Sequence, residues 1–157
     1  MSVKEMNRRE LGLALSAFAA LGGLAAEAQS NAPSTEDTKL VHSSLFPYDK
    51  LPIKTSSNGM ESRSVLRGTL ATGEYLEVHE TMLPAGKMPH PPHRHTHSEV
   101  LLIREGKLEV DSDGQRGIVT PGSVIFTASG VLHSLKNVGD GPATYFVVAV
   151  GVQRAIT

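Results

Sequence analysis

Beyond residue 40, hydrophobic residues recur in short runs that are typical of β-strands. The runs are rich in Val, Ile, Leu and Thr, are separated by Gly, Pro, Asp or Asn, and show almost no helical periodicity. Asp113-Gly114 and Asp140-Gly141-Pro142 predict hairpin turns, and Gly106 and Gly130 are expected in turns that need a positive φ. Short strands separated by turn signals predict an all-β sandwich or barrel. The predicted strands are residues 64–71, 74–83, 99–110, 115–120, 123–128, 133–138 and 143–150.

The strand predicted at residues 99–110 is apolar on both faces. If Glu99 points inward, alternation places Leu101 and Ile103 on the same inner face, below Glu99. Val100 and Leu102 then lie on the outer face, where they are expected to contact the opposite sheet surface or a partner.

Four residues have the chemistry and spacing of a site for one metal ion. His93, His95 and Glu99 have the same strand parity, and residues of one parity share a face of a pleated strand. His133 follows a glycine turn at the start of another predicted strand. Neutral imidazoles and one carboxylate suit Mn, Fe, Ni, Cu or Zn better than Mg or Ca. We therefore expect one divalent transition-metal ion at these residues.

The same residues lie in two stretches that resemble the paired motifs of the cupin superfamily. The first motif, G-x5-H-x-H-x3/4-E-x6-G, resembles residues 86–106, although six residues rather than five precede His93. The second motif, G-x5-P-x-G-x2-H-x3-N, resembles residues 122–137 with Ala128 in place of the proline. Neither departure touches a candidate ligand, so the departures bear on loop geometry and not on metal chemistry.

The resemblance implies a double-stranded β-helix, the jelly-roll barrel of the cupins, as a single domain over residues 41–157. It supports His93, His95, Glu99 and His133 as ligands of a mononuclear metal, for which Mn or Fe is favoured and Zn, Ni or Cu are alternatives. Dimers that bury the outer sheet face are common among cupins. Together with the apolar outer face of the strand, this favours a homodimer.

Residues 1–28 resemble a cleaved export signal. Arg8 and Arg9 precede an uncharged Ala/Leu/Gly run at residues 11–24, and Ala-Glu-Ala at 26–28 fits the small-x-small pattern of signal peptidase sites. The arginine pair resembles a twin-arginine signal, with the general secretory pathway as the alternative. We therefore expect a periplasmic or extracellular bacterial protein.

The apolar run is too short for a stable membrane anchor, because about 14 residues of helix span roughly 21 Å and a hydrocarbon core is about 30 Å thick. Residues 29–40 are expected to form a flexible leader to the domain.

The composition excludes several other classes of protein. The formal net charge is −1 and no basic stripe is present, which argues against nucleic-acid binding. The absence of cysteine excludes disulfides, thiolate zinc sites and cysteine nucleophiles. A length of 157 residues with 39% hydrophobic content fits one domain with a modest core. Three Tyr, four Phe and no Trp favour a small substrate over a large aromatic one.

Three imidazoles and one carboxylate leave a six-coordinate ion with two open positions, which indicates catalysis or ligand binding. A tetrahedral Zn closed by the same four ligands would instead be structural. The leading hypothesis is a dioxygenase-type oxidoreductase, because an anionic ligand makes Fe or Mn easier to oxidise. A metal-dependent isomerase, decarboxylase or lyase, and a non-catalytic cupin that binds a small ligand, remain alternatives.

The other polar residues receive more ordinary roles. His42 and His79 are isolated histidines, whereas His97 is expected to hydrogen-bond a metal ligand or to lie at the rim. Asn137 is expected to tie down a loop. The carboxylates of residues 74–83 are expected to be solvated, so no catalytic residue beyond the metal ligands is predicted.

Overall fold

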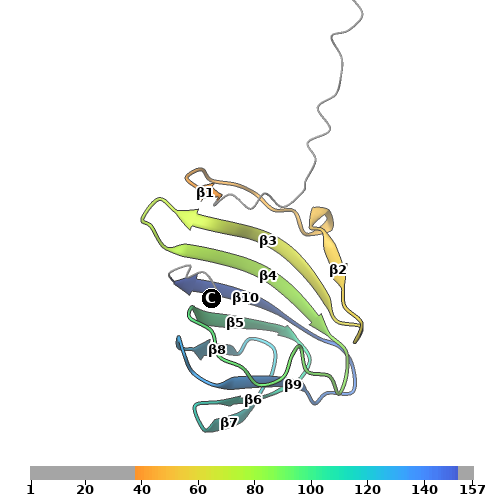
Figure 1. The fold of residues 1–157 in the computed structure, drawn as a ribbon. Coiled ribbons are helices and arrows are strands. Elements are labelled where there is room, and N and C mark those ends of the chain that lie inside the picture. Colours follow the sequence, from red (N-terminus) through yellow and green to blue (C-terminus); the bar gives the residue numbers. More distant parts are fainter. Residues whose placement is uncertain (1–37, 152–157) are drawn as a thin grey trace, which may run out of the picture. The chain divides into compact units, whose positions relative to one another are not determined.

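The structure is a computed structural model that describes residues 38–151, so the predicted export signal and residues 29–37 of the predicted leader lie outside the described residues. Within the described range the chain is almost entirely β-structure, which confirms the predicted fold class (Figure 1). No helix between residues 38 and 151 is long and apolar enough to cross a membrane. The elements are β1 Lys39–Leu40, the 3-10 helix η1 Tyr48–Lys50, β2 Ile53–Thr55, β3 Glu61–Leu70, β4 Tyr75–Leu83, β5 Ser98–Glu105, β6 Leu108–Ser112, β7 Gln115–Val119, β8 Val124–Thr127, β9 His133–Asn137 and β10 Ala143–Gly151.

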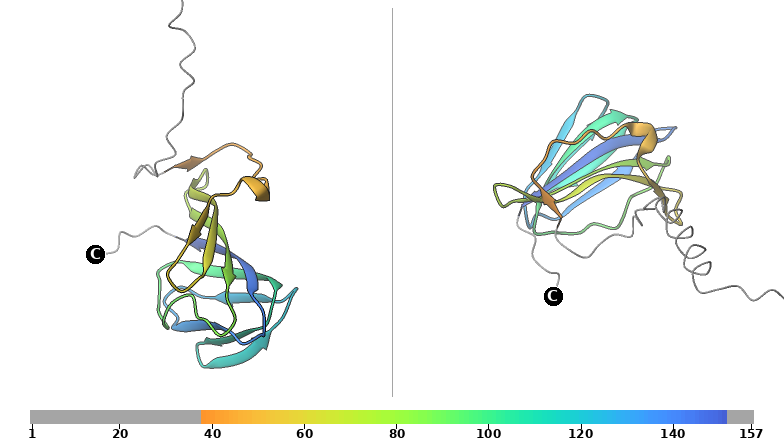
Figure 2. Two further views of the ribbon diagram at one scale, coloured as in Figure 1. Left: turned by 90° about the vertical axis from the view of Figure 1, so that its right-hand side faces the viewer. Right: turned by 90° about the horizontal axis from the view of Figure 1, so that it is seen from above.

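The strands form two sheets of a jelly roll. The larger sheet has the order β1-β3-β4-β10-β5-β8, with β2 also paired to β3, and the smaller sheet has the order β7-β6-β9. All pairs are antiparallel except β1 with β3. The larger sheet curves around the smaller one, and the final strand β10 lies between β4 and β5 (Figures 1 and 2).

The core lies between the two sheets and contains the inner-face residues of both. Leu101 and Ile103 of β5 are buried in it, as their parity predicts, and Leu102 on the other face is 42% exposed. Burial of aliphatic side chains stabilises the fold by roughly 1.5 to 3 kcal/mol for each fully buried residue. The buried cluster consists of Leu83, Leu101, Ile103, Leu108, Ile125, Leu135, Ala143, Tyr145 and Val147.

The strand predicted at residues 99–110 is in fact two strands, β5 and β6, separated at Gly106. Gly106 has a φ of +85°, and a Cβ at this position would lie 2.6 Å from the Cα of Ala143. The turn therefore needs a residue with no side chain, both for its backbone conformation and for the close approach of β10. The predicted hairpin between β6 and β7 is confirmed, with positive φ at both Asp113 and Gly114.

The N-terminal part of the domain contains two short strands that the sequence pattern does not reveal. Lys39 and Leu40, assigned above to the flexible leader, form β1 and pair with Thr69 and Leu70 of β3. The described sheet therefore starts two residues before the predicted domain boundary at residue 41. Strands of two and three residues are too short to show an alternating pattern.

A buried charge cluster attaches η1 to the outer face of the larger sheet. Glu80 is only 2% exposed, and its carboxylate pairs with the guanidinium groups of Arg63 and Arg104. Both guanidinium groups lie over the ring of Tyr48, at 4.8 and 5.4 Å from its centroid. The expectation that the carboxylates of this strand are solvated is therefore wrong for Glu80, because two arginines and a tyrosine cover it.

Candidate metal centre

Two of the predicted ligands face each other across an isolated antiparallel bridge. His93 lies in the loop between β4 and β5, and His133 is the first residue of β9. The backbone N–H of each residue donates to the carbonyl oxygen of the other, at 3.1 Å in both cases. Residues that exchange both hydrogen bonds lie directly opposite each other, with their side chains on one face. The bridge therefore brings together two imidazoles that are far apart in the sequence.

His95 is positioned by a loop and not by a strand. The backbone N–H of Gly130 donates to the carbonyl oxygen of His95 at 2.8 Å, and the Arg94 guanidinium donates to the carbonyl oxygen of Gly130. Strand β5 begins only at Ser98, so His93 and His95 lie in the preceding loop although they share the strand parity of Glu99. The imidazoles of His93 and His95 thus point to one site because backbone hydrogen bonds hold their loop, and not because the residues alternate along a strand.

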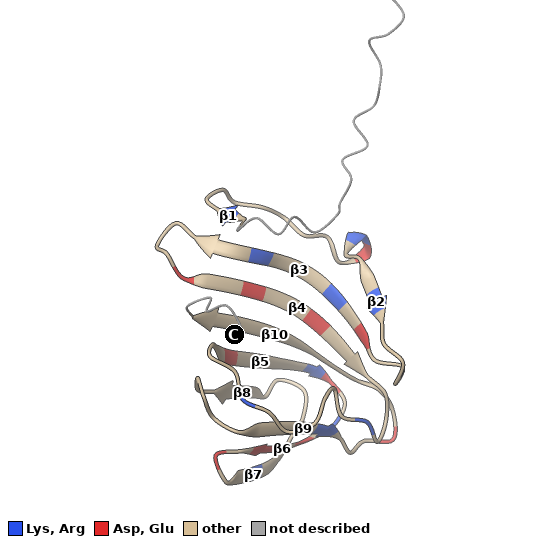
Figure 3. Ribbon diagram, in the orientation of Figure 1, with Lys and Arg blue, Asp and Glu red and all other residues tan. Residues whose placement is uncertain are grey.

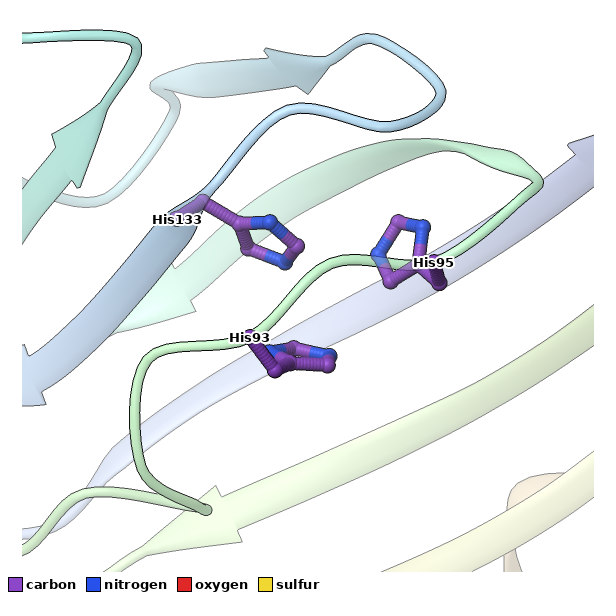
Figure 4. A group of neighbouring side chains, drawn as sticks. All are labelled: His93, His95 and His133. Carbon is purple, nitrogen blue, oxygen red and sulfur yellow. The ribbon is translucent and has the colours of Figure 1, made fainter.

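The three imidazoles converge on one point, as Figure 4 shows. One ring nitrogen from each of His93, His95 and His133 lies within 4.8 Å of the others. Nitrogens that bind one ion at about 2.1 Å are at most about 4.2 Å apart, so closure around an ion needs a shift of roughly half an ångström. Rotation of the side chains is enough for such a shift.

Glu99 completes the cluster from the inner face of β5. Its Oε2 atom lies 3.3 Å from Nε2 of His95 and 3.8 Å from Nε2 of His133. The structure therefore brings all four predicted ligands together from a loop, β5 and β9.

Backbone carbonyls determine which nitrogen of two imidazoles carries the proton. Nδ1 of His95 lies 2.7 Å from the carbonyl oxygen of His97, and Nδ1 of His133 lies 3.0 Å from that of Val131. A carbonyl oxygen only accepts hydrogen bonds, so Nδ1 must be the protonated nitrogen in both rings. The lone pair of each neutral ring is then on Nε2, which faces Glu99.

This arrangement leaves buried polar atoms that a cation would satisfy. Nδ1 of His93 and Nε2 of His95 are buried without a hydrogen-bond partner. In the neutral Nδ1–H form of His95, Nε2 and the carboxylate oxygen of Glu99 3.3 Å away are both acceptors, so this contact supplies no hydrogen bond. Two buried acceptors at this distance repel each other unless a proton or a metal ion lies between them. The donor set thus fits a divalent transition metal.

Burial also keeps His93 in the form that binds metal. Desolvation, followed by the neighbouring His90, His133 and His95, lowers the pKa of His93 to about 4, against the opposing effect of Glu99. The imidazole is therefore neutral at neutral pH, so that a metal does not have to displace a proton from it.

His97 orients the carboxylate of Glu99, as expected for a residue that hydrogen-bonds a metal ligand. Its ring stacks on that of His95, with centroids 3.8 Å apart and an interplanar angle of 7°. Its Nε2 lies 3.2 Å from Oε1 of Glu99. One carboxylate oxygen is thus held by His97 while the other faces the three imidazoles. His90 instead packs edge-on against His93 at 3.9 Å.

A cavity of about 220 Å³ lies beside the cluster, inside the barrel. It is smaller than the roughly 300 to 1,000 Å³ of pockets for drug-sized ligands, so it suits a small molecule. Glu99 and His133 line it together with apolar residues and with further polar side chains that include Ser62, His79 and Tyr145. Burial raises the pKa of the Tyr145 phenol, so Tyr145 remains a neutral group on the cavity wall.

His79 is a cavity residue that the sequence reasoning missed. It was treated as an isolated histidine, but it lies on the inner face of β4, with Glu77 two positions before it and buried Leu83 four positions after it. Residues at even separations along a strand share a face. Because Leu83 is four positions from His79, the expectation that Leu83 is in the core could have placed His79 on the inner face. His42, by contrast, is exposed and outside the cavity.

Comparison with known proteins agrees with this geometry. A family model described as "Cupin domain" matches residues 79–149, which include all four candidate ligands. No curated protein matches the sequence.

Several solved structures share the fold. They include an RmlC-like cupin from Shewanella frigidimarina (18% identity, 71% of this chain and 95% of that chain, TM-score 0.60). A structure described as a predicted oxalate decarboxylase from Thermotoga maritima has 19% identity, covers 69% of this chain and 100% of that chain, and has a TM-score of 0.59. KdgF from Halomonas sp. has 16% identity, covers 70% of this chain and 96% of that chain, and has a TM-score of 0.61. At such identities the likeness shows the fold alone.

Proposed function

We propose that this chain, whose residues 79–149 match a family model described as "Cupin domain", is a mononuclear-metal cupin that acts on a small molecule, with dioxygenase-type oxidation as its leading reaction. The observation that carries the metal proposal is the convergence of the donors: one ring nitrogen from each of three imidazoles lies within 4.8 Å of the others, and Oε2 of Glu99 lies 3.3 Å from Nε2 of His95. His93, His95, Glu99 and His133 would hold the ion. Mn or Fe is the favoured metal, because an anionic carboxylate makes these ions easier to oxidise, and Zn, Ni or Cu are the alternatives.

The bound ion would supply Lewis acidity and, for Mn or Fe, redox chemistry at its open positions. The protein orients the candidate ligands and keeps water away from the substrate cavity. The carbonyl oxygens of His97 and Val131 hold two imidazoles in the Nδ1–H form, and the His97 ring holds one oxygen of Glu99. The cavity then confines a small substrate beside the cluster, where the apolar side chains of Leu101, Leu135 and Val147 line its wall.

Oxygen uptake tests the leading reaction. Protein loaded with Fe²⁺ or Mn²⁺ is assayed with a panel of small diketones, catechols and hydroxy acids, and His95→Ala provides the metal-free control. We expect oxygen consumption with at least one compound and none in the variant. Binding of a panel member without turnover would instead favour a non-catalytic cupin that captures a small ligand.

A second function is a metal-dependent isomerase, decarboxylase or lyase. It is favoured by His79 on the cavity wall, whose Nδ1 lies 3.5 Å from Oε1 of Glu77. These reactions need a proton donor or acceptor beside the metal, which dioxygen chemistry does not require. One structure that shares the fold is described as a predicted oxalate decarboxylase, in agreement with this class.

We also propose that the protein is a homodimer that buries the outer face of the larger sheet. Leu102, Val124 and Phe126 lie on neighbouring strands of this face and are 42%, 60% and 64% exposed. Adjacent exposed apolar residues of this kind are typical of interaction surfaces. Sedimentation at micromolar concentration should give a dimer for the wild type and a monomer for Phe126→Glu; a monomeric wild type contradicts the proposal.

We further propose that residues 1–28 are a cleaved export signal. Lysine substitution of Arg8 and Arg9 should block export of the folded protein if the twin-arginine pathway carries it. Unchanged export of the variant would support the general secretory pathway, and retention of the wild type in the cytoplasm would contradict the proposed periplasmic or extracellular location.

A further inference from the structure

Strand β4, which lies two strands from Glu99 in the same sheet, carries a second set of polar groups at consecutive inner-face positions. Nδ1 of His79 lies 3.5 Å from Oε1 of Glu77, and the hydroxyl of Tyr75 donates to Oε2 of Glu77 at 3.0 Å. Both oxygens of the carboxylate are thus occupied. Of these three residues, His79 is the one whose side chain lines the cavity.

Positive charge on the neighbouring strand keeps Glu77 ionised. Arg67 of β3 is the cross-strand partner of Glu77, and basic and acidic positions alternate across β3 and β4 in Figure 3. The pKa of Glu77 is lowered to about 2, chiefly by its interaction with His79, then by Tyr75 and Arg67, against the opposing effect of burial. An ionised Glu77 only accepts hydrogen bonds, so it favours the tautomer of His79 in which Nδ1, 3.5 Å from Oε1, carries the hydrogen. Nε2 is then the ring nitrogen available to a molecule in the cavity.

Sheet register places His79 within reach of a molecule at the metal centre. Strands β4, β10 and β5 are neighbours, and Glu77, Ala149 and Glu99 form one cross-strand row. Two strand spacings of about 4.8 Å separate β4 from β5, so the two side walls of the cavity are about 10 Å apart at the backbone. The cross-strand row of His79 itself continues through Val147 of β10 to Leu101 of β5, two positions along the strands from the row of Glu99. His79, Glu99 and His133 all line the same cavity.

We propose that His79 is a catalytic acid/base residue of this cavity, that Glu77 is its positioning residue, and that the substrates are small carbonyl compounds with a C–H bond next to the carbonyl group. This inference rests on the proposed mononuclear-metal function. A carbonyl substrate suits the site because a cation on one wall stabilises negative charge on the carbonyl oxygen, while a base on the other wall faces the adjacent carbon.

The step is a proton transfer that needs no oxidant or reductant. Nε2 of His79 takes the proton from the carbon next to the carbonyl group. The C–H electron pair becomes the carbon–carbon double bond of the enolate, and the carbonyl π pair moves to oxygen. Return of a proton from Nε2 to the same carbon restores the carbonyl compound, and exchange of the Nε2 proton with solvent leaves a solvent hydrogen on that carbon. Glu77 compensates the positive charge that His79 carries in between.

Exchange of pyruvate methyl protons in D₂O tests the proposal. Protein loaded with Mn²⁺ is incubated with pyruvate, and deuterium uptake is followed by mass spectrometry against protein-free Mn²⁺. We expect the wild type to accelerate uptake, and His79→Gln to lose roughly 100-fold or more of that acceleration, in line with general acid–base catalysis. His42→Gln is the matched control, because His42 is exposed and outside the cavity, and it should exchange like the wild type.

A second measurement does not depend on turnover. In Zn²⁺-loaded wild-type protein, the ¹⁵N NMR shifts of the His79 ring should show a protonated Nδ1 and an unprotonated Nε2. Glu77→Gln should lose this preference, since an amide can donate to Nδ1 as well as accept from it, and Glu77→Asp should restore part of it.

The outcomes separate this inference from the proposed function. Protein that binds no metal overturns the proposed function itself. Metal-loaded wild type that fails to exchange pyruvate, or His79→Gln with normal metal content and wild-type exchange, overturns the role of His79 alone. An Nε2–H tautomer of His79 in the wild type also overturns it.

Discussion

Asn137 offers the sharpest test of how the fold supports the metal centre. Its side chain is fully buried and makes three hydrogen bonds to the backbone. Nδ2 donates to the carbonyl oxygens of Leu83 and Gly141, each at 2.9 Å, and Oδ1 accepts from the N–H of Gly139 at 3.0 Å. One amide thus joins the end of β4 to the turn between β9 and β10, which confirms the predicted loop-tying role.

The backbone of Asn137 extends this junction to the loop that carries two of the candidate ligands. Its carbonyl oxygen accepts from Gly86, and its N–H donates to the carbonyl oxygen of Lys87. A change at Asn137 should therefore loosen the start of the loop that positions His93 and His95. The effect on the metal centre is expected to be indirect, because Asn137 does not line the cavity.

The expected loss of folding stability follows from the number of hydrogen bonds that the Asn137 side chain makes. Three bonds at about 1 kcal/mol each predict a loss of about 3 kcal/mol for Asn137→Ala. Asn137→Asp keeps the size of the side chain but replaces two N–H donors with an oxygen that faces two carbonyls. The loss for Asn137→Asp at neutral pH should therefore be larger, about 4 to 5 kcal/mol, because a buried charge loses its hydration. At about 4 °C per kcal/mol for a domain of this size, the melting temperature should fall by roughly 12 °C for Ala and more for Asp.

Thermal unfolding followed by circular dichroism measures both losses, and metal titration by calorimetry measures the loosening of the loop. Asp140→Ala is a suitable control, because Asp140 is exposed and neighbours the same turn. It should change the melting temperature by no more than about 2 °C. A loss below about 4 °C for Asn137→Asp, or a smaller loss for Asp than for Ala, would refute the reasoning.

Three further predictions follow from the site and the fold. His133→Ala should lose most of the bound metal while the barrel stays folded, and metal content equal to that of the wild type by elemental analysis would refute its role as a ligand. Gly106→Ala should lose more than about 2 kcal/mol in urea unfolding, since its Cβ would lie 2.6 Å from Ala143 at a positive φ, whereas Gly141→Ala meets no atom within 4 Å and should change little. The stability of the metal-free protein should decrease as pH falls from about 6.5 to about 4, because the unfolded state protonates His93 before the folded state does. His93→Gln should flatten this pH dependence in chemical denaturation, and an unchanged slope would contradict the pKa assigned to His93.

The sequence is sufficient to predict the fold class and the four residues that meet at the candidate metal centre. Alternation predicts the inner face of β5 correctly, because Leu101 and Ile103 are in the core. The two motifs place His93, His95, Glu99 and His133 in a common site, although the reason is different from the one that parity suggests. A proline-rich loop and a bridge between His93 and His133 bring the rings together, and the backbone pairing of a loop leaves no periodic signal.

The roles of the residues on β4 depend on tertiary contacts that no local pattern shows. Glu80 and Glu77 are three residues apart on one strand, yet they lie on opposite faces of the sheet and pair with different arginines. Glu80 is covered by η1, which approaches from a segment without a strand pattern. The position of His79 on the cavity wall follows from its parity only once the inner face of β4 is known.

The central position of β10 has a consequence for synthesis of the protein. Although β10 is the last of the described strands to leave the ribosome, it pairs with β4 on one side and with β5 on the other. Until it arrives, both of those strands present unpaired backbone edges, which can recruit other chains. Folding of the barrel should therefore be largely post-translational and slow, as the many distant contacts in the chain also imply. A nascent chain stalled before Ala143 should be a substrate for chaperones.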